Sequence, residues 1–139
     1  MMKYRLEMFV MPVSDVDRAK GFYEQAGFAC DVDHQPGPEF RVVQFTPPGS
    51  ECSFTFGVGM PTKASPGDYQ GMHLIVNDVE AAMEDLRGRG IEVDGPFHFG
   101  PKGQTPGLPD ERIDYATYGS FHDPDGNGWL LQEVPSRPE

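Results

Sequence analysis

The chain has 139 residues, a length that suits a single domain, 1–139, with one buried core. Its 11 basic and 22 acidic side chains give a net charge of -11, which opposes binding to phosphate backbones and which we interpret as a solvated acidic surface. No apolar run is long enough to span a membrane, and the N-terminus lacks the apolar core of a signal peptide. We therefore expect a cytoplasmic protein that binds neither nucleic acid nor membrane.

The first predicted elements are a strand over Leu6 to Val13 and a helix that begins after Asp15. The Asp15 carboxylate can accept the free N–H groups of a first helical turn, and Gly27 suits the left-handed residue at a helix end. Apolar residues at helical spacing form one face of this helix: Val16, Ala19 and Tyr23. Three strands are expected to follow: Phe28 to Val32, Glu39 to Phe45 and Glu51 to Val58.

The same pattern recurs later in the chain at a constant offset, so that Val13 corresponds to Val76, Asp15 to Asp78 and Gly27 to Gly90. The second helix has the corresponding apolar face: Val79, Ala82 and Leu86. A strand precedes it and three follow: Met72 to Val76, Ile91 to Asp94, Tyr115 to His122 and Gly128 to Val134. The repeat predicts two βαβββ modules, 4–60 and 69–135.

Turns and an insertion separate the strands. The sequences TPPGS and DPDGN predict tight hairpins, with Gly49 and Gly126 at the positions that need positive φ. The second half carries an additional Gly/Pro-rich stretch, Pro96 to Asp114, which we expect to be irregular. Two interpretations are open for it, a functional loop and a tolerated surface insertion. Cys30 and Cys52 form no metal or redox motif, so we expect reduced, buried thiols.

The repeated segment PVSDVDRAKGFYEQAGF and the closing segment GSFHDPDGNGWLLQEV resemble the vicinal oxygen chelate superfamily. That superfamily includes glyoxalase I, extradiol dioxygenases and bleomycin-resistance proteins. The resemblance extends from Tyr4 to Val134. It implies an α+β fold in which two βαβββ modules form a curved mixed sheet around a central cavity, with helices on the convex side. It also implies two-fold pairing of chains, so we expect a homodimer.

The metal enzymes of that superfamily place His, Gln or Glu in the first and last strand of each module. The positions that match here hold Met8 and Ser53 in the first module and Gly71 and Leu130 in the second. A zinc, nickel, iron or manganese site needs imidazole or carboxylate ligands. We therefore expect neither a metal nor another cofactor.

Strand alternation predicts the neighbours that face the same side as these four positions. The expected ligand-binding set is Met8, Val10, Glu51, Ser53, Thr55, Gly71, His73, Leu130 and Gln132. Their opposite neighbours, such as Phe54 and Trp129, should pack under the helices. Among the lining residues, His73 and Glu51 are the candidates for acid/base chemistry.

These residues favour a metal-free small-molecule binding protein of the glyoxalase/bleomycin-resistance type, which sequesters an antibiotic or a metabolite. An alternative is a lyase, isomerase or dioxygenase-like enzyme that uses His73 and Glu51 or a relocated metal site, for which His98 is a further candidate. A third possibility is an interaction protein with a vestigial pocket. No phosphate-binding loop, dinucleotide fingerprint or serine nucleophile elbow occurs in the sequence.

Overall fold

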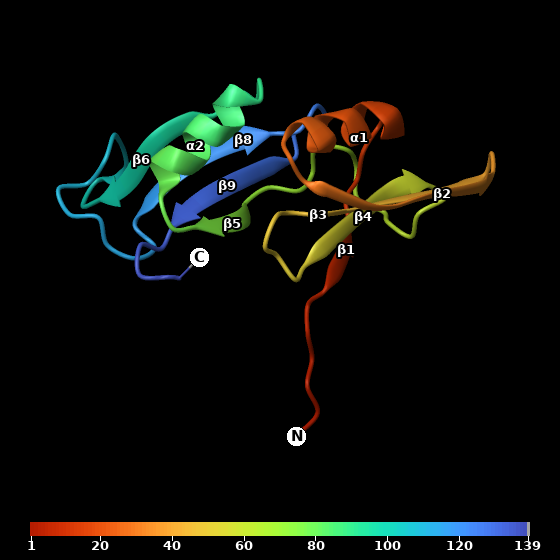
Figure 1. Ribbon diagram of the computed structural model, residues 1–139, viewed down its shortest axis with the longest axis horizontal. Coiled ribbons are helices and arrows are strands. Elements are labelled where there is room, and N and C mark those ends of the chain that lie inside the picture. Colours follow the sequence, from red (N-terminus) through yellow and green to blue (C-terminus); the bar gives the residue numbers. More distant parts are fainter. Residues whose placement is uncertain (139) are drawn as a thin grey trace. The chain divides into compact units, whose positions relative to one another are not determined.

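The computed structural model describes residues 1–138, which contain two helices and nine strands (Figure 1). In chain order these are β1 (Met8–Val10), α1 (Val16–Gln25), β2 (Ala29–Gly37), β3 (Phe40–Thr46), β4 (Ser53–Val58), β5 (Met72–Val76), α2 (Val79–Gly88), β6 (Asp94–Gly100), β7 (Gly103–Pro106), β8 (Thr117–His122) and β9 (Gly128–Glu133). Neither of these helices is long and apolar enough to cross a membrane. The predicted α+β class is confirmed.

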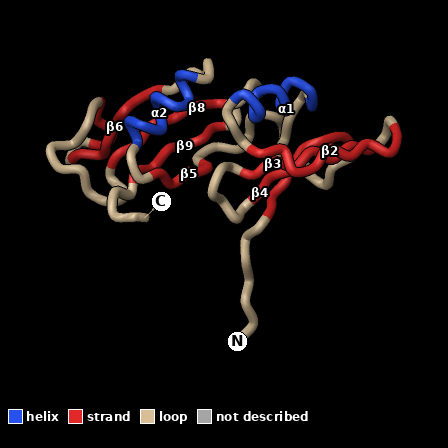
Figure 2. The backbone as a smooth tube through the Cα atoms, viewed as in Figure 1, coloured by secondary structure: helices blue, strands red, loops and turns tan. Residues whose placement is uncertain are grey.

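Two compact units make up the described chain. The first contains residues 1–69 and 123–127, and the second contains residues 70–122 and those from 128 onward. Each unit has one helix and one mixed sheet (Figure 2). The strand orders are β1-β4-β3-β2 and β5-β9-β8-β6-β7, and in each sheet the strand that precedes the helix lies parallel to the last strand. The repeat in the sequence therefore corresponds to a repeat in topology.

Local signals at the helix ends act as the sequence predicts. The Asp15 side chain accepts a hydrogen bond from the Arg18 N–H at 3.0 Å, and Asp78 caps α2 in the same way. Gly27 and Gly90 adopt φ angles of 86° and 85°, in the left-handed region that favours glycine. These positions end both helices before the next strand begins.

In the first unit, α1 packs on the sheet through aromatic side chains. Tyr23 is fully buried, and its ring centroid lies 4.8 Å from that of Phe54 and 5.8 Å from that of Phe45. Phe45 stacks on Phe56 at 5.9 Å. Ala19 is buried beside Tyr23 on the helix, as the predicted apolar face requires. This cluster is the core of the first unit.

In the second unit, α2 packs through Val79, Met83 and Leu86. Met83 takes the buried position that we expected for Ala82, because its long side chain reaches β8. A Cβ on Gly119 would lie only 3.1 Å from the Met83 sulfur, so glycine leaves room for this contact. Beneath the helix, Phe121 stacks on Trp129 at 6.1 Å.

The expectation that the segment Pro96 to Asp114 is irregular is wrong for its first half. Strands β6 and β7 form an antiparallel hairpin within it, and β7 is an additional edge strand of the second sheet. Pro106 ends this edge strand, where the missing N–H of proline is tolerated. The predicted strand at Ile91 to Asp94 is also wrong, because β6 begins only at Asp94. The second unit thus has four strands after its helix.

Two predictions about the first unit need correction as well. Strand β1 is shorter than Leu6 to Val13, and residues 1–7 leave the sheet as an extended segment without a neighbouring strand (Figure 1). Cys30 is exposed rather than buried, because β2 is an edge strand whose residues are almost all solvent-accessible. Cys52 is half-buried.

The DPDGN turn joins β8 to β9, yet it packs within the first unit. The buried Asp123 carboxylate accepts hydrogen bonds from the Tyr23 hydroxyl and the Asn127 side chain, both at 2.9 Å. Asn127 also donates to the Pro12 carbonyl at 2.8 Å. The polar residues of this motif therefore serve packing, and they are committed to protein partners.

Candidate functional site

The face of the first sheet that points away from α1 carries four of the predicted lining residues. Parallel pairing places Met8 opposite Ser53 and Val10 opposite Thr55. Phe54 lies between Ser53 and Thr55 in sequence and packs in the aromatic cluster under α1. Because side chains alternate along a strand, Ser53, Thr55 and their partners on β1 point to the helix-free face. Ser53 and Thr55 are only 8% and 3% exposed. The Ser53 hydroxyl also bonds with that of Thr46 at 2.6 Å, so this face offers few available groups.

The helix-free face of the second sheet is more accessible. Strand β9 pairs Leu130 with His73 and Gln132 with Ile75 of β5, and Tyr118 of β8 lies on the other side of Gln132. His73 is exposed, and Ile75 is 38% exposed. The predicted strand phase of His73, Leu130 and Gln132 is therefore correct.

Three aromatic side chains extend this face across β8 and β6, and the prediction from sequence missed them. Phe97 stacks on Tyr118 with ring centroids 5.5 Å apart, and Phe99 meets Tyr118 edge-on at 5.3 Å. Phe99 is 59% exposed. The His73 ring lies 6.3 Å from that of Tyr118. We name Phe97, Phe99 and Tyr118 the aromatic platform. The alternation in Phe97-His98-Phe99 is the sequence signal for it, and the expectation of an irregular segment hides that signal.

Polar atoms beside the platform are held in defined orientations. The Gln132 side-chain amide donates to the Tyr118 hydroxyl at 2.8 Å and to the Tyr115 carbonyl at 3.2 Å, which leaves its oxygen as an acceptor. His73 Nδ1 lies 2.6 Å from the Gly71 carbonyl oxygen. Because a carbonyl only accepts, Nδ1 carries the proton, and Nε2 of the neutral ring is an acceptor. The face can therefore orient a ligand through at least two acceptors.

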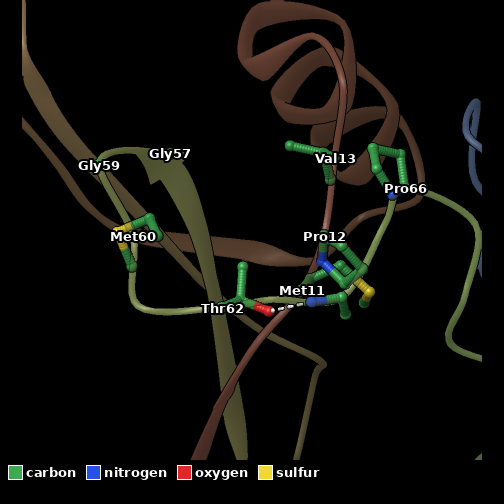
Figure 3. Close-up of a pocket in the computed structure, with 9 residues that line it drawn as sticks. Met11, Pro12, Val13, Gly57, Gly59, Met60, Thr62 and Pro66 are labelled. Atoms are coloured by element: carbon green, nitrogen blue, oxygen red, sulfur yellow. Dashed lines mark hydrogen bonds between the residues drawn. The ribbon is translucent and has the colours of Figure 1, made fainter.

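Each unit has a hollow on its surface. In the first unit a hollow of about 220 Å³ is lined by Met11, Pro12, Val13, Gly57, Gly59, Met60, Thr62, Ala64 and Pro66, among which Thr62 has the one polar side chain (Figure 3). The Thr62 hydroxyl oxygen accepts the Ala64 N–H at 3.2 Å, so this polar group is already engaged.

The hollow in the second unit is larger, about 520 Å³, and it adjoins the aromatic platform through Phe97. Its walls are formed by Asp94, Gly95, Pro96, Phe97, Gln104, Pro106 and Ser120. Three of these side chains are polar, in contrast to the single hydroxyl in the first hollow. A hollow with an aromatic wall and a few polar groups is typical of a small-molecule site.

Comparison with known proteins identifies the family of the chain. The sequence profile of the Glyoxalase/Bleomycin resistance protein/Dioxygenase superfamily matches residues 5–131. The chain belongs to this superfamily. Its fold is similar to that of TnmS3, an antibiotic binding protein from Streptomyces sp. CB03234, with 33% identity, a TM-score of 0.71 and coverage of 96% of this chain and 98% of that one.

Two other similar proteins extend the comparison. A structure from Sphaerobacter thermophilus DSM 20745 is 30% identical, with a TM-score of 0.69 and coverage of 96% and 99%. The uncharacterized protein YetH of Bacillus subtilis (strain 168) is 26% identical over 122 residues, 87% of this chain and 91% of that protein. The resemblance that the sequence motifs indicated is thus confirmed over nearly the whole chain.

The residues at the superfamily's metal positions do not fit a metal ion. Met8, Ser53 and Leu130 offer no strong donor, and strand pairing places His73 rather than Gly71 opposite Leu130. Within residues 1–138, no group of three His, Cys, Asp or Glu side chains lies close enough together to hold a metal. We derive no catalytic step through a metal.

The remaining candidates are not brought together on this face. Strand β4 begins at Ser53, so Glu51 lies before it, exposed and outside the strand alternation on which its prediction depended. Gly71 likewise precedes β5. His98 pairs with Thr117 and lies on the face of the second sheet opposite to His73. Its Nδ1 is hydrogen-bonded to the Gly107 carbonyl oxygen at 2.8 Å. A relocated metal site that joins His73 and His98 is therefore ruled out by the strand phase.

Proposed function

We propose that this protein binds a small organic molecule, without a metal, on the helix-free face of its second sheet. The observation that carries the proposal is the aromatic platform beside the acceptor atoms of His73 and Gln132. Phe99 is the exposed ring of this platform, whereas Phe97 and Tyr118 are half-buried. The Phe97 and Tyr118 rings stack, and Phe99 meets them edge-on, so the three rings form one connected apolar surface. A ligand that packs against these rings would remove that surface from water. The two acceptors would set the orientation of the ligand.

The comparisons support binding as the role of the site. TnmS3 is described as an antibiotic binding protein, and one third of its aligned residues are identical to this chain. We propose the same class of role here, the sequestration of an antibiotic or a related metabolite. The absence of donor side chains at Met8, Ser53, Gly71 and Leu130 supports binding without a metal.

We also propose that the protein is a homodimer. Met2, Tyr4, Leu6 and Met8 are exposed, and they alternate with charged residues along an extended segment that has no neighbouring strand. This period of two is the pattern of a half-buried strand. Strand β1 lies at the edge of its sheet, so a second copy can pair with this segment and cover its apolar side chains.

The binding proposal is tested by a thermal-shift screen of aromatic small molecules, followed by calorimetry of any compound that stabilises the protein. We expect His73→Ala to weaken binding by about several-fold to a hundredfold, as for the loss of a neutral or charged hydrogen bond. The control is His34→Ala, which removes an exposed imidazole from β2 of the first unit. Its affinity should match the parent.

Glu51→Ala completes the series, because the sequence predicts that Glu51 also contacts the ligand. Loss of affinity in this variant would support the predicted contact of Glu51 with the ligand. Unchanged affinity would restrict the site to the second sheet. If His73→Ala and Phe99→Ala both bind as tightly as the parent, the platform is not the binding surface and the proposal fails.

A further inference from the structure

The hollow in the second unit lies on the same face as the aromatic platform. Asp94 of β6 pairs with Ser120 of β8, and Ser120 pairs with Leu130 on the helix-free side. Phe97 belongs both to the platform and to the wall of the hollow. A ligand that lies on the rings can therefore extend a substituent toward Asp94.

The polar side chains of the hollow are uncommitted. The exposed Asp94 carboxylate takes part in none of the hydrogen bonds or ion pairs of residues 1–138, and the same holds for the side chains of Ser120 and Gln104. The nearby Arg87 is engaged elsewhere, because its guanidinium donates to the Val93 carbonyl at 2.6 Å. The hollow thus combines a free carboxylate with two further groups that can accept hydrogen bonds.

The geometry points to the chemical class of the ligand: we propose that it is a planar aromatic molecule with a protonated amine. The aromatic part would lie on the platform, and the ammonium group would enter the hollow beside Asp94. A carboxylate and ring faces both attract a cation, the first by a charge-assisted hydrogen bond and the second by the ring quadrupole. The net charge of -11 adds long-range attraction for a cation and repulsion for an anion. This inference rests on the proposed binding function.

Three naphthalene probes that share one ring system and differ in the charge of their single substituent test the inference on the full chain. They are 2-naphthylmethylammonium, the neutral 2-naphthalenemethanol and the anionic 2-naphthoate, with affinity measured by the anisotropy of naphthalene fluorescence. We expect the ammonium probe to bind most tightly and the anion most weakly. Asp94→Asn should weaken the ammonium probe about tenfold, as for a lost charge-assisted hydrogen bond, and should change the alcohol by less than about twofold.

Matched variants separate this inference from the binding function itself. Asp110→Asn removes a carboxylate from an exposed loop of the same unit, and it should leave the ammonium affinity unchanged. Phe99→Ala should weaken the ammonium and the alcohol alike. If the alcohol binds as tightly as the ammonium and only Phe99→Ala weakens both, the cation inference is overturned while the binding function stands. Equal effects of Asp94→Asn and Asp110→Asn, or no binding of any probe, would also overturn it.

Discussion

The two units share one topology, yet they place their aromatic side chains on opposite faces of the sheet. In the first unit Tyr23, Phe54 and Phe56 are buried between the helix and the sheet. In the second unit Trp129 is buried on the helix-facing side of the sheet, while Phe99 lies exposed on the helix-free side. The same supersecondary framework therefore builds an aromatic core in one unit and an aromatic surface in the other.

The alternation of side chains along a strand is the physical origin of this difference, because residues an even number of positions apart share one face. On β8, Tyr118 and Phe121 are an odd number of residues apart, so one ring faces away from the helix and the other faces toward it. On β4, Phe54 and Phe56 are an even number apart and share the helix side. An exposed aromatic surface thus needs no change of fold, only aromatic residues at strand positions that face away from the helix.

The largest expected effect contrasts a ring from each unit. Phe54→Ala should lower the free energy of unfolding by about 3–5 kcal/mol, because it leaves a cavity in the core of the first unit. Phe99→Ala should change it by no more than about 0.5 kcal/mol, because the ring is exposed. Urea unfolding measures both. Similar losses for the two variants would contradict the assignment of one ring to the core and the other to the surface.

The first unit exposes Met2, Tyr4 and Leu6 along the segment 1–7, outside its sheet. Leu6→Glu should shift the protein from dimer to monomer in light scattering, because burial of a leucine side chain contributes about 1.5–3 kcal/mol. Leu108→Glu, at an exposed leucine of the second unit, should leave the dimer intact. A monomeric parent protein at micromolar concentration would refute the homodimer.

A partly buried ion pair between Arg112 and Glu133 connects the segment before β8 to strand β9 in the second unit. Glu133 is 1% exposed and accepts from Arg112 Nε and from the Val79 N–H, both at 2.8 Å. Glu133→Gln should lower the free energy of unfolding by about 1.5–3 kcal/mol, as for hydrogen bonds to charged groups. The control is Glu84→Gln on the exposed side of α2, where we expect almost no change. Equal stability of the two variants would show that this pair contributes nothing.

The smallest expected effect comes from a surface cluster of the first unit. Hydrogen bonds from Arg41 and Lys20 hold the pKa of the Asp33 carboxyl well below its usual range. A lowered folded-state pKa means that this stabilisation is present above the unfolded value, about 3.9, and is lost as the pH falls through the folded value. Asp33→Asn should therefore lower Tm slightly at pH 7, as expected for a surface ion pair.

The pH dependence of that difference is the critical measurement. The gap in Tm between the parent and Asp33→Asn should shrink as the pH falls below about 4, where the Asp33 carboxyl of the unfolded chain begins to take up a proton while the folded one stays charged. Asp110→Asn has no ion pair to lose and serves as the control. A gap that stays constant down to pH 2 would show that the carboxylate charge of Asp33 does not stabilise the fold.

Much of the framework was predictable because its signals are local. The helix caps at Asp15 and Asp78 and the left-handed glycines at Gly27 and Gly90 depend on a few adjacent residues, and all are found where the sequence predicted them. The phase of His73 was predictable for the same reason, since alternation needs only the strand itself. The contact of this residue with a ligand stays a prediction.

What the sequence alone determined is therefore the repeated α+β pattern, the helix ends and the side of the sheet on which most strand residues lie. Tertiary structure decided the rest. Pairing across the second sheet turned a Gly/Pro-rich stretch into the β6–β7 hairpin, placed Phe97 beside Tyr118 and set His73 opposite Leu130. The physical reason is that register and strand partners depend on residues distant in sequence, whereas caps and alternation depend on neighbours.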